Sequence, residues 1–168
     1  MRRFINNYVG KSLIALLVVF AACEEGDEIF DQIRDAEQRG AILRTINVTS
    51  DEVPIGASES YFGVEVEYQD QQDGDLLSAL EVYVGFTDNT IEPGGTDKSK
   101  AEALAATIAA SEFSIGEFGL PRTSYEITLP EMLSALALPD ADVDGGDVFG
   151  IRFEIVMTDC RRFSNDDN

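Results

Sequence analysis

Histidine and tryptophan are both missing from this chain of 168 residues, and cysteine occurs only twice. Without histidine, the chain has neither the commonest general base nor a Ser-His or Cys-His arrangement for nucleophilic catalysis. Without tryptophan, it lacks the commonest aromatic platform for stacking sugar rings. These absences argue against catalysis, and we predict that the protein is not an enzyme.

Positive charge is also scarce. The chain has 12 Lys and Arg residues against 32 Asp and Glu residues, which gives a formal net charge of −20. Such a charge repels nucleic-acid phosphates, so we expect no nucleic-acid partner. It favours solubility and divalent cations, although an ordinary solvated acidic surface would have the same composition.

Long apolar runs are absent as well. The main run, residues 12–22 (SLIALLVVFAA), has 11 residues. At ~1.5 Å per helical residue it is too short to cross a hydrocarbon core of roughly 30 Å. It follows a basic start with Arg2, Arg3 and Lys11, as the h-region of a signal peptide does. We therefore predict a signal-peptide helix over residues 1–22 and no transmembrane anchor.

The apolar run ends in Phe20-Ala21-Ala22-Cys23. Small residues before a cysteine resemble the lipobox of bacterial lipoproteins, although leucine is usual where this chain has Phe20. The resemblance implies cleavage before Cys23, a diacylglycerol on its thiol and an acyl chain on the new amino group. Each buried CH₂ of these chains would contribute ~0.8 kcal/mol to membrane anchoring. The alternative is an ordinary secretory peptide with a chance cysteine.

Removal of residues 1–22 would leave 146 residues, enough for one domain with a core. Three basic residues would leave with the peptide, and the formal charge would become −23. Residues 23–40 begin with an acidic stretch at 24–28 (EEGDE) and are predicted to form a tether. In lipoproteins of the Bacteroidota, such a stretch resembles the signal for display on the outer face of the outer membrane.

From residue 41 the pattern becomes that of β-strands, with apolar residues at alternate positions. The alanines of residues 100–110 fit either a helix or a strand, and Pro130 predicts a short helix over residues 130–137. Short strands separated by Gly, Pro and Asp predict an antiparallel, immunoglobulin-like β-sandwich over residues 41–168. The predicted strands are 41–48, 61–68, 80–86, 124–129 and 148–157.

The end of the chain predicts an incomplete sheet. A turn over residues 158–161 is followed by a return strand of about three residues, whereas strands usually have ~5–6. We expect the sandwich to lack its last strand, with a truncated C-terminus, unless the tail simply frays. A last strand would also be the natural place for a partner of Cys160, because Cys23 is used by the lipid.

Four stretches together resemble small uncharacterised surface lipoproteins of the Bacteroidota that accompany Sus-type outer-membrane uptake systems. They are residues 39–46 (RGAILRTI), 83–89 (YVGFTDN), 118–123 (FGLPRT) and 146–159. The resemblance spans roughly residues 39–164. It implies an immunoglobulin-like accessory protein and carries no catalytic residue. The family tends to have Asp-Gly-Arg in the last hairpin, where this chain has Asp159-Cys160-Arg161.

One acidic loop has the spacing of a Ca²⁺ site. Its candidate ligands are Asp140, Asp142, Asp144 and Asp147. The first three, with the glycine that follows them, match positions 1, 3, 5 and 6 of an EF-hand, but Ile151 replaces the bidentate Glu of position 12. An EF-hand is therefore excluded, while a looser Ca²⁺ site and a solvated acidic turn both remain open. A weaker cluster of the same kind consists of Asp70, Asp73 and Asp75.

Two tyrosines are candidates for stacking against a ligand, because Tyr83 lies on the polar face of its predicted strand and Tyr61 is out of phase with Phe62. The sequence thus predicts a lipid-anchored accessory protein that contacts a glycan or the proteins of an uptake complex. A Ca²⁺-dependent adhesion or structural module is the alternative. An enzyme is the third class, and the sequence contains no catalytic motif to support it.

Overall fold

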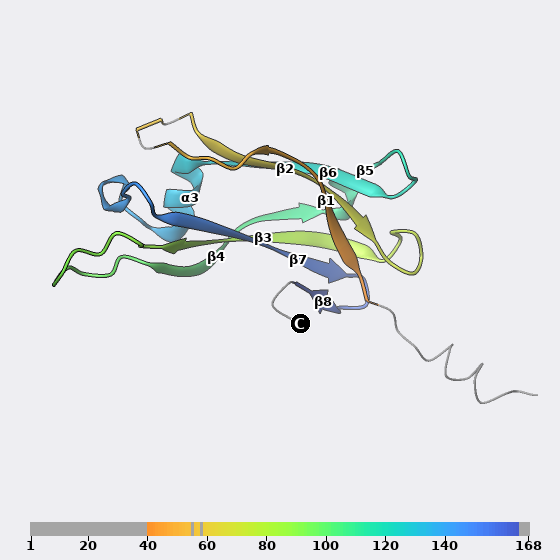
Figure 1. The fold of residues 1–168 in the computed structure, drawn as a ribbon. Coiled ribbons are helices and arrows are strands. Elements are labelled where there is room, and N and C mark those ends of the chain that lie inside the picture. Colours follow the sequence, from red (N-terminus) through yellow and green to blue (C-terminus); the bar gives the residue numbers. More distant parts are fainter. Residues whose placement is uncertain (1–39, 55, 58, 165–168) are drawn as a thin grey trace, which may run out of the picture. The chain divides into compact units, whose positions relative to one another are not determined.

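A computed structural model describes residues 40–54, 56, 57 and 59–164 (Figure 1). The predicted signal peptide, its helix, Cys23 and nearly all of the tether lie outside these residues, as do residues 165–168. In the part of the chain that is described, no helix has the length and apolar character needed to span a membrane.

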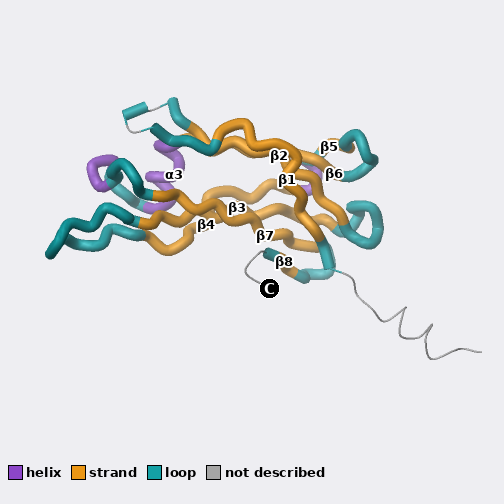
Figure 2. Tube along the Cα trace, in the orientation of Figure 1, coloured by secondary structure: helices purple, strands orange, loops and turns teal. Residues whose placement is uncertain are grey.

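The domain consists of two antiparallel sheets, and each has four strands (Figure 2). The first sheet has the order β1-β2-β6-β5, with strands Ile42–Ser50, Tyr61–Gln69, Pro121–Thr128 and Ser114–Ile115. The second has the order β4-β3-β7-β8, with strands Lys100–Ala109, Leu77–Thr87, Val148–Met157 and Arg162–Phe163. The described residues also form three short helices: η1 (Ala110–Glu112), α3 (Leu129–Leu136) and η2 (Asp140–Asp142).

The predicted all-β sandwich is confirmed. In immunoglobulin-type sandwiches, strands A, B, E and D form one sheet and C, F and G the other, and variable-type domains add C′ beside C. The observed orders are compatible with that scheme, with β8 in the place of strand G. The finer immunoglobulin-like assignment stays a prediction.

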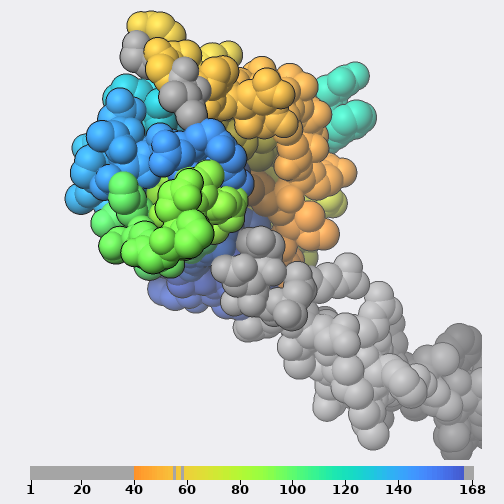
Figure 3. All heavy atoms as spheres, turned by 60° about the vertical axis from the view of Figure 1, so that its left-hand side comes forward, coloured from red at the N-terminus to blue at the C-terminus, as the bar shows by residue number. Residues whose placement is uncertain are grey.

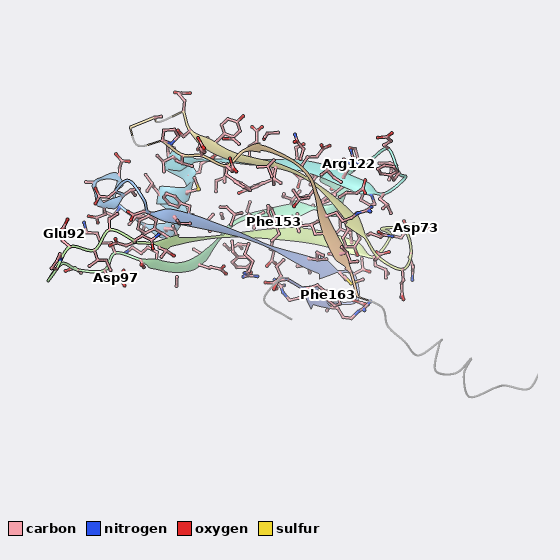
Figure 4. The ribbon with its side chains drawn as sticks, viewed as in Figure 1. Asp73, Glu92, Asp97, Arg122, Phe153 and Phe163 are labelled. Carbon is pink, nitrogen blue, oxygen red and sulfur yellow. The ribbon has the colours of Figure 1, made fainter. Side chains whose placement is uncertain are left out.

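The core follows from alternating apolar residues on facing strands. Val66 and Tyr68 of β2 and Val82 and Val84 of β3 are at most 1% exposed. Between the sheets, the ring of Tyr125 on β6 meets that of Phe153 on β7 edge-on, with centroids 6.1 Å apart. Phe153 is labelled in Figure 4. Such edge-to-face contacts are favoured by the quadrupoles of the rings.

The alanine-rich segment forms strand β4, not a helix. Its partner is β3, and the register places Ala109 opposite Ala79 and Ile108 opposite Leu80. The predicted short helix is confirmed as α3, although it begins at Leu129, so Pro130 occupies its second position. Glu131 accepts hydrogen bonds from the backbone N–H of Thr128 at 2.8 Å and from its hydroxyl at 2.7 Å. These contacts fix the start of the helix.

The β2–β3 connection is organised by Asp70, which is 7% exposed. Its carboxylate accepts hydrogen bonds from the N–H groups of Gln72, Gly74 and Leu76 at 2.6–2.9 Å, and from the hydroxyl of Tyr68 at 2.8 Å. The backbone donors counteract burial and hold the pKa of Asp70 below its ordinary value. The turn over residues 70–75 is therefore stabilised by a buried carboxylate.

Candidate functional site

The acidic loop at residues 140–147 lies against the loop at residues 88–98. In Figure 3 the two appear as neighbouring blue and green segments. The Nζ of Lys98 lies 2.5 Å from Oδ1 of Asp142. Oδ1 of Asp147 accepts hydrogen bonds from the N–H of Asn89 at 2.9 Å and the hydroxyl of Thr90 at 3.2 Å. Two of the four predicted Ca²⁺ ligands thus join the two loops.

Asp147 also caps its own turn. Its Oδ2 accepts the N–H of Asp144 at 2.8 Å, and this backbone hydrogen bond is the main cause that lowers the pKa of Asp147. Asp140 and Asp144 are exposed. Among residues 40–54, 56, 57 and 59–164, no group of three or more His, Cys, Asp or Glu side chains is arranged to hold a metal ion. The Ca²⁺ site stays a prediction.

The two candidate stacking tyrosines lie on different sheets. The hydroxyl of Tyr83 on β3 donates to Oε2 of Glu81 at 2.6 Å, which raises the pKa of Tyr83. The guanidinium of Arg152 lies 4.3 Å from the centre of the Tyr83 ring and covers it by a cation–π contact. Tyr61 on β2 lies half-buried against Gly63, where a Cβ would be 2.8 Å from the tyrosine ring. Their role in ligand stacking stays a prediction.

Arg152 belongs to a row of alternating charges across the outer face of the second sheet. Its guanidinium lies 2.7 Å from Glu102 of β4 and 2.8 Å from Glu154 of β7. On β8, Arg162 bonds Glu154 and also Glu81 of β3. These ion pairs connect β8 to the rest of the sheet. The sequence does not predict the row, because its members come from four separate strands.

A second charged cluster covers the outer face of the first sheet. The side chain of Glu67 on β2 is fully buried and is bonded by Arg44 of β1 and by Arg122 of β6. Arg122 lies 2.8 Å from Glu67, and its hydrogen bond is the main cause that lowers the pKa of this carboxyl. The sequence predicts that Glu67 faces away from the core. Its burial by two arginines was not predicted.

Cys160, in the turn between β7 and β8, is exposed and has no disulfide partner in the described residues. Its φ of +68° places it in the left-handed region, which glycine adopts more readily. Cys23, the predicted lipidation residue, lies outside the described residues.

A groove opens between β1 and β7, and we call it the edge groove. Its volume is about 670 Å³. Its apolar lining comes from both sheets: Ile42, Leu43, Val66, Ile151, Phe153, Ile155 and Phe163. Figure 4 labels two of these residues, Phe153 of β7 and Phe163 of β8. Among the described residues, β8 pairs only with Ile155 and Val156, so no described strand covers the rest of this side of β7.

A second cavity, of about 340 Å³, shares Ile151 with the edge groove and extends it toward α3. We call it the acidic end. Its apolar lining includes Phe62, Met132 and Phe149. Four aspartates also line it: Asp51, Asp140, Asp144 and Asp147. The predicted Ca²⁺ ligands that are not engaged with Lys98 therefore lie at one end of a long apolar groove.

Ile42 and Val148, which line these two cavities, are 59% and 52% exposed. Such side chains are costly to leave in water, and exposed apolar patches often mark interaction sites. The sequence does not predict the groove, because the groove results from the spacing of two sheets and the length of β8. Comparison of the chain with family models, curated proteins and solved structures finds no match.

Proposed function

We propose that this protein is a lipid-anchored, non-catalytic binding or scaffolding protein of the outer-membrane surface, and that it serves a nutrient (glycan) uptake system. The edge groove carries the proposal. It is an apolar cleft of several hundred Å³ with polar groups at one end, and ligand sites commonly have this form. The ligand would be a glycan or a protein of the uptake complex.

The N-terminal sequence supports the anchored location. Basic residues, an apolar run and Ala21-Ala22-Cys23 follow one another in the order of a lipoprotein leader. Residues 24–40 separate Cys23 from the first residues of β1, and a chain of that length reaches at most roughly 60 Å. The sandwich would thus be tethered within that distance of the membrane.

The engagement of the buried carboxylates supports a binding role over catalysis. Glu67 is held by two arginines, and Asp70 is saturated by backbone and tyrosine donors. Glycoside hydrolysis needs two carboxyl groups that face each other across a cleft, ~5–10 Å apart. These two acids stabilise β-strands and a turn, and neither lines the edge groove or its acidic end. Four aspartates do line the acidic end, and one of them, Asp147, already accepts hydrogen bonds from the N–H groups of Asn89 and Asp144.

Ligand capture by the full chain, displayed on cells, tests the proposal. The variant Thr45→Trp places an indole at the groove, because Thr45 is an exposed residue of its lining. The matched control is Thr107→Trp, at an exposed position on β4. We expect the unmodified protein and the control to capture a polysaccharide or uptake-complex proteins, and Thr45→Trp to lose that capture.

Equal capture by both variants would contradict the groove as the binding site. Hydrolysis of a glycan by the purified protein would contradict the non-catalytic role. The variant Cys23→Ser tests membrane anchoring separately. We expect this variant to be absent from the membrane fraction, because it removes the thiol to which the lipid would be attached.

A further inference from the structure

The arrangement of strands around the edge groove indicates which kind of ligand the groove can bind. We propose that the groove accepts an extended strand of a partner protein, which pairs with β7 and carries Lys or Arg beside the acidic end. This inference deepens the proposed binding role and rests on it. Strand addition to a sheet edge is an established mode of peptide recognition, in which backbone hydrogen bonds supply affinity and side-chain pockets supply specificity.

The backbone of β7 offers the hydrogen bonds. The N–H of Met157 donates to the carbonyl of Arg161 at 2.9 Å, so the backbone groups of Met157 point toward β8. Alternate residues of a strand direct their backbone groups to the same side, so those of Phe149 and Ile151 point that way too. In the register of the described residues, β8 pairs only with Ile155 and Val156. No described residue pairs with Phe149 or Ile151 on this side, so their backbone donors and acceptors are available to an added strand.

The side chains around this edge of β7 are those of a sandwich interior. Ile151, Phe153 and Ile155 are spaced two apart on β7 and all line the groove. Opposite them, Leu43 of β1 and Val66 of β2 line its other wall. An added strand would direct alternate side chains between these walls. Its inward residues should therefore be apolar, and its outward residues can be polar.

The acidic end determines the charge of the strand. Four aspartates line it, and no Lys or Arg of the described residues does. The nearest described cation of the two loops, Lys98, already pairs with Asp142. An antiparallel strand that continues the direction of β8 would end beside Val148 and this acidic end. Basic residues at its C-terminal end would meet complementary charge.

Two other occupants fit less well. Residues 165–168 are Asn-Asp-Asp-Asn, which have no apolar side chain for the groove and add negative charge at an acidic site. A second copy that paired β7 with β7 would place acidic loops of both copies at the two ends of one interface. With a formal net charge of −20 per chain, such pairing would work against repulsion.

The test uses the protein obtained from the full chain and a fluorescein-labelled peptide, Thr-Val-Thr-Ile-Thr-Val-Thr-Lys-Lys. One control peptide ends in Glu-Glu. A second has N-methyl groups on alternate backbone nitrogens and cannot form a ladder. Fluorescence anisotropy measures binding. We expect saturable binding of the first peptide and at least roughly tenfold weaker binding of both controls.

Matched variants locate the peptide. Asp140→Asn with Asp144→Asn removes two charges from the acidic end, and we expect roughly tenfold weaker binding of the Lys-Lys peptide. Asp73→Asn with Asp75→Asn removes two charges from exposed positions in the β2–β3 turn and should leave binding unchanged. Thr45→Trp should abolish binding, and Thr107→Trp should not. Equal binding of the Lys-Lys peptide by the variants and their matched controls would overturn the proposal.

Amide hydrogen exchange shows whether the peptide pairs with the backbone of β7, which peptide binding alone does not show. In the free protein we expect the N–H groups of Phe149 and Ile151 to exchange quickly, and the peptide to protect them. Protection of both amides in the free monomer would overturn the proposal, because the edge would then be covered by the chain itself. Protection that rises with protein concentration would overturn it in favour of a second copy. A glycan that binds at the groove while the peptide does not would leave the proposed function standing and overturn only the strand.

Discussion

At the scale of single residues, Glu67 has the greatest effect on its surroundings. It is a carboxylate with no exposed surface, and two arginines from the neighbouring strands surround it. A buried ion pair is costly to break, because removal of one charge leaves its partners uncompensated. Glu67 therefore joins β1, β2 and β6 more firmly than a surface ion pair would.

We predict that Glu67→Gln lowers the melting temperature by at least about 5 °C at pH 7. The pKa of Glu67 is lowered below its ordinary value of 4.5, so its stabilisation is present above pH 4.5 and is lost as the pH falls through the folded pKa. Thermal melts from pH 7 to pH 3 should show the difference between the two proteins shrinking below pH 4.5. Glu126→Gln, on an exposed site of β6, is the control and should have little effect. A difference that stays constant with pH would contradict this role.

The sequence predicted the direction of the Glu67 side chain and missed its partners. Alternation along residues 61–68 assigns Val64 and Val66 to the core and Glu67 to the other face, and the structure agrees. The arginines lie 23 and 55 positions away, so their convergence depends on the pairing of strands. Local periodicity contains no information about that pairing.

At the scale of elements, helix α3 closes one end of the core. Leu129, Met132 and Leu136 recur at helical spacing and are buried. Pro130 and the Thr128–Glu131 hydrogen bonds explain why the helix starts where it does. These signals are local, and for that reason the sequence predicted the helix to within one residue.

We predict that Met132→Ala destabilises the domain by roughly 2–5 kcal/mol, because Met132 has no exposed surface and its truncation leaves a cavity. Denaturant unfolding measures the change. Ser134→Ala, on the exposed side of the same helix, should alter stability by less than about 0.5 kcal/mol. Equal effects of the two substitutions would show that α3 does not pack against the sheets as described.

Strand β4 shows where local signals fail. Its alanines favour a helix by intrinsic propensity, yet the segment pairs with β3 over ten residues. Tertiary context decides such cases, because the backbone of β3 would otherwise have an unpaired side. The edge groove has the same origin, since it depends on how far β8 extends along β7.

At the scale of the whole molecule, repulsion among like charges opposes folding. The formal net charge is −20, and it becomes −23 once the predicted signal peptide is removed. We predict that an increase in NaCl from about 10 to about 150 mM raises the melting temperature, because the Debye length falls from about 30 to about 8 Å. A melting temperature that falls with salt would mean that favourable ion pairs dominate instead.

We expect Ca²⁺ to change the melting temperature only by screening the repulsion among the acidic side chains, as NaCl does. Asp147 and Asp142 already bind protein donors, so we expect CaCl₂ to give no stabilisation beyond that of NaCl at equal ionic strength. Thermal melts with matched salts and with chelator check this. A larger rise with Ca²⁺ that Asp144→Asn abolishes would contradict it and favour the Ca²⁺-dependent adhesion or structural module, because a ligand that binds only the folded state stabilises it.

The most direct test of the anchored binding protein is the intact mass of the protein recovered from the membranes of a Gram-negative host that expresses the full chain. Our account predicts a chain that begins at Cys23 and carries a diacylglyceryl group and an N-acyl chain, with Cys23→Ser producing no lipidated species. A chain that keeps residues 1–22, or one cleaved there with an unmodified Cys23 thiol, would contradict it.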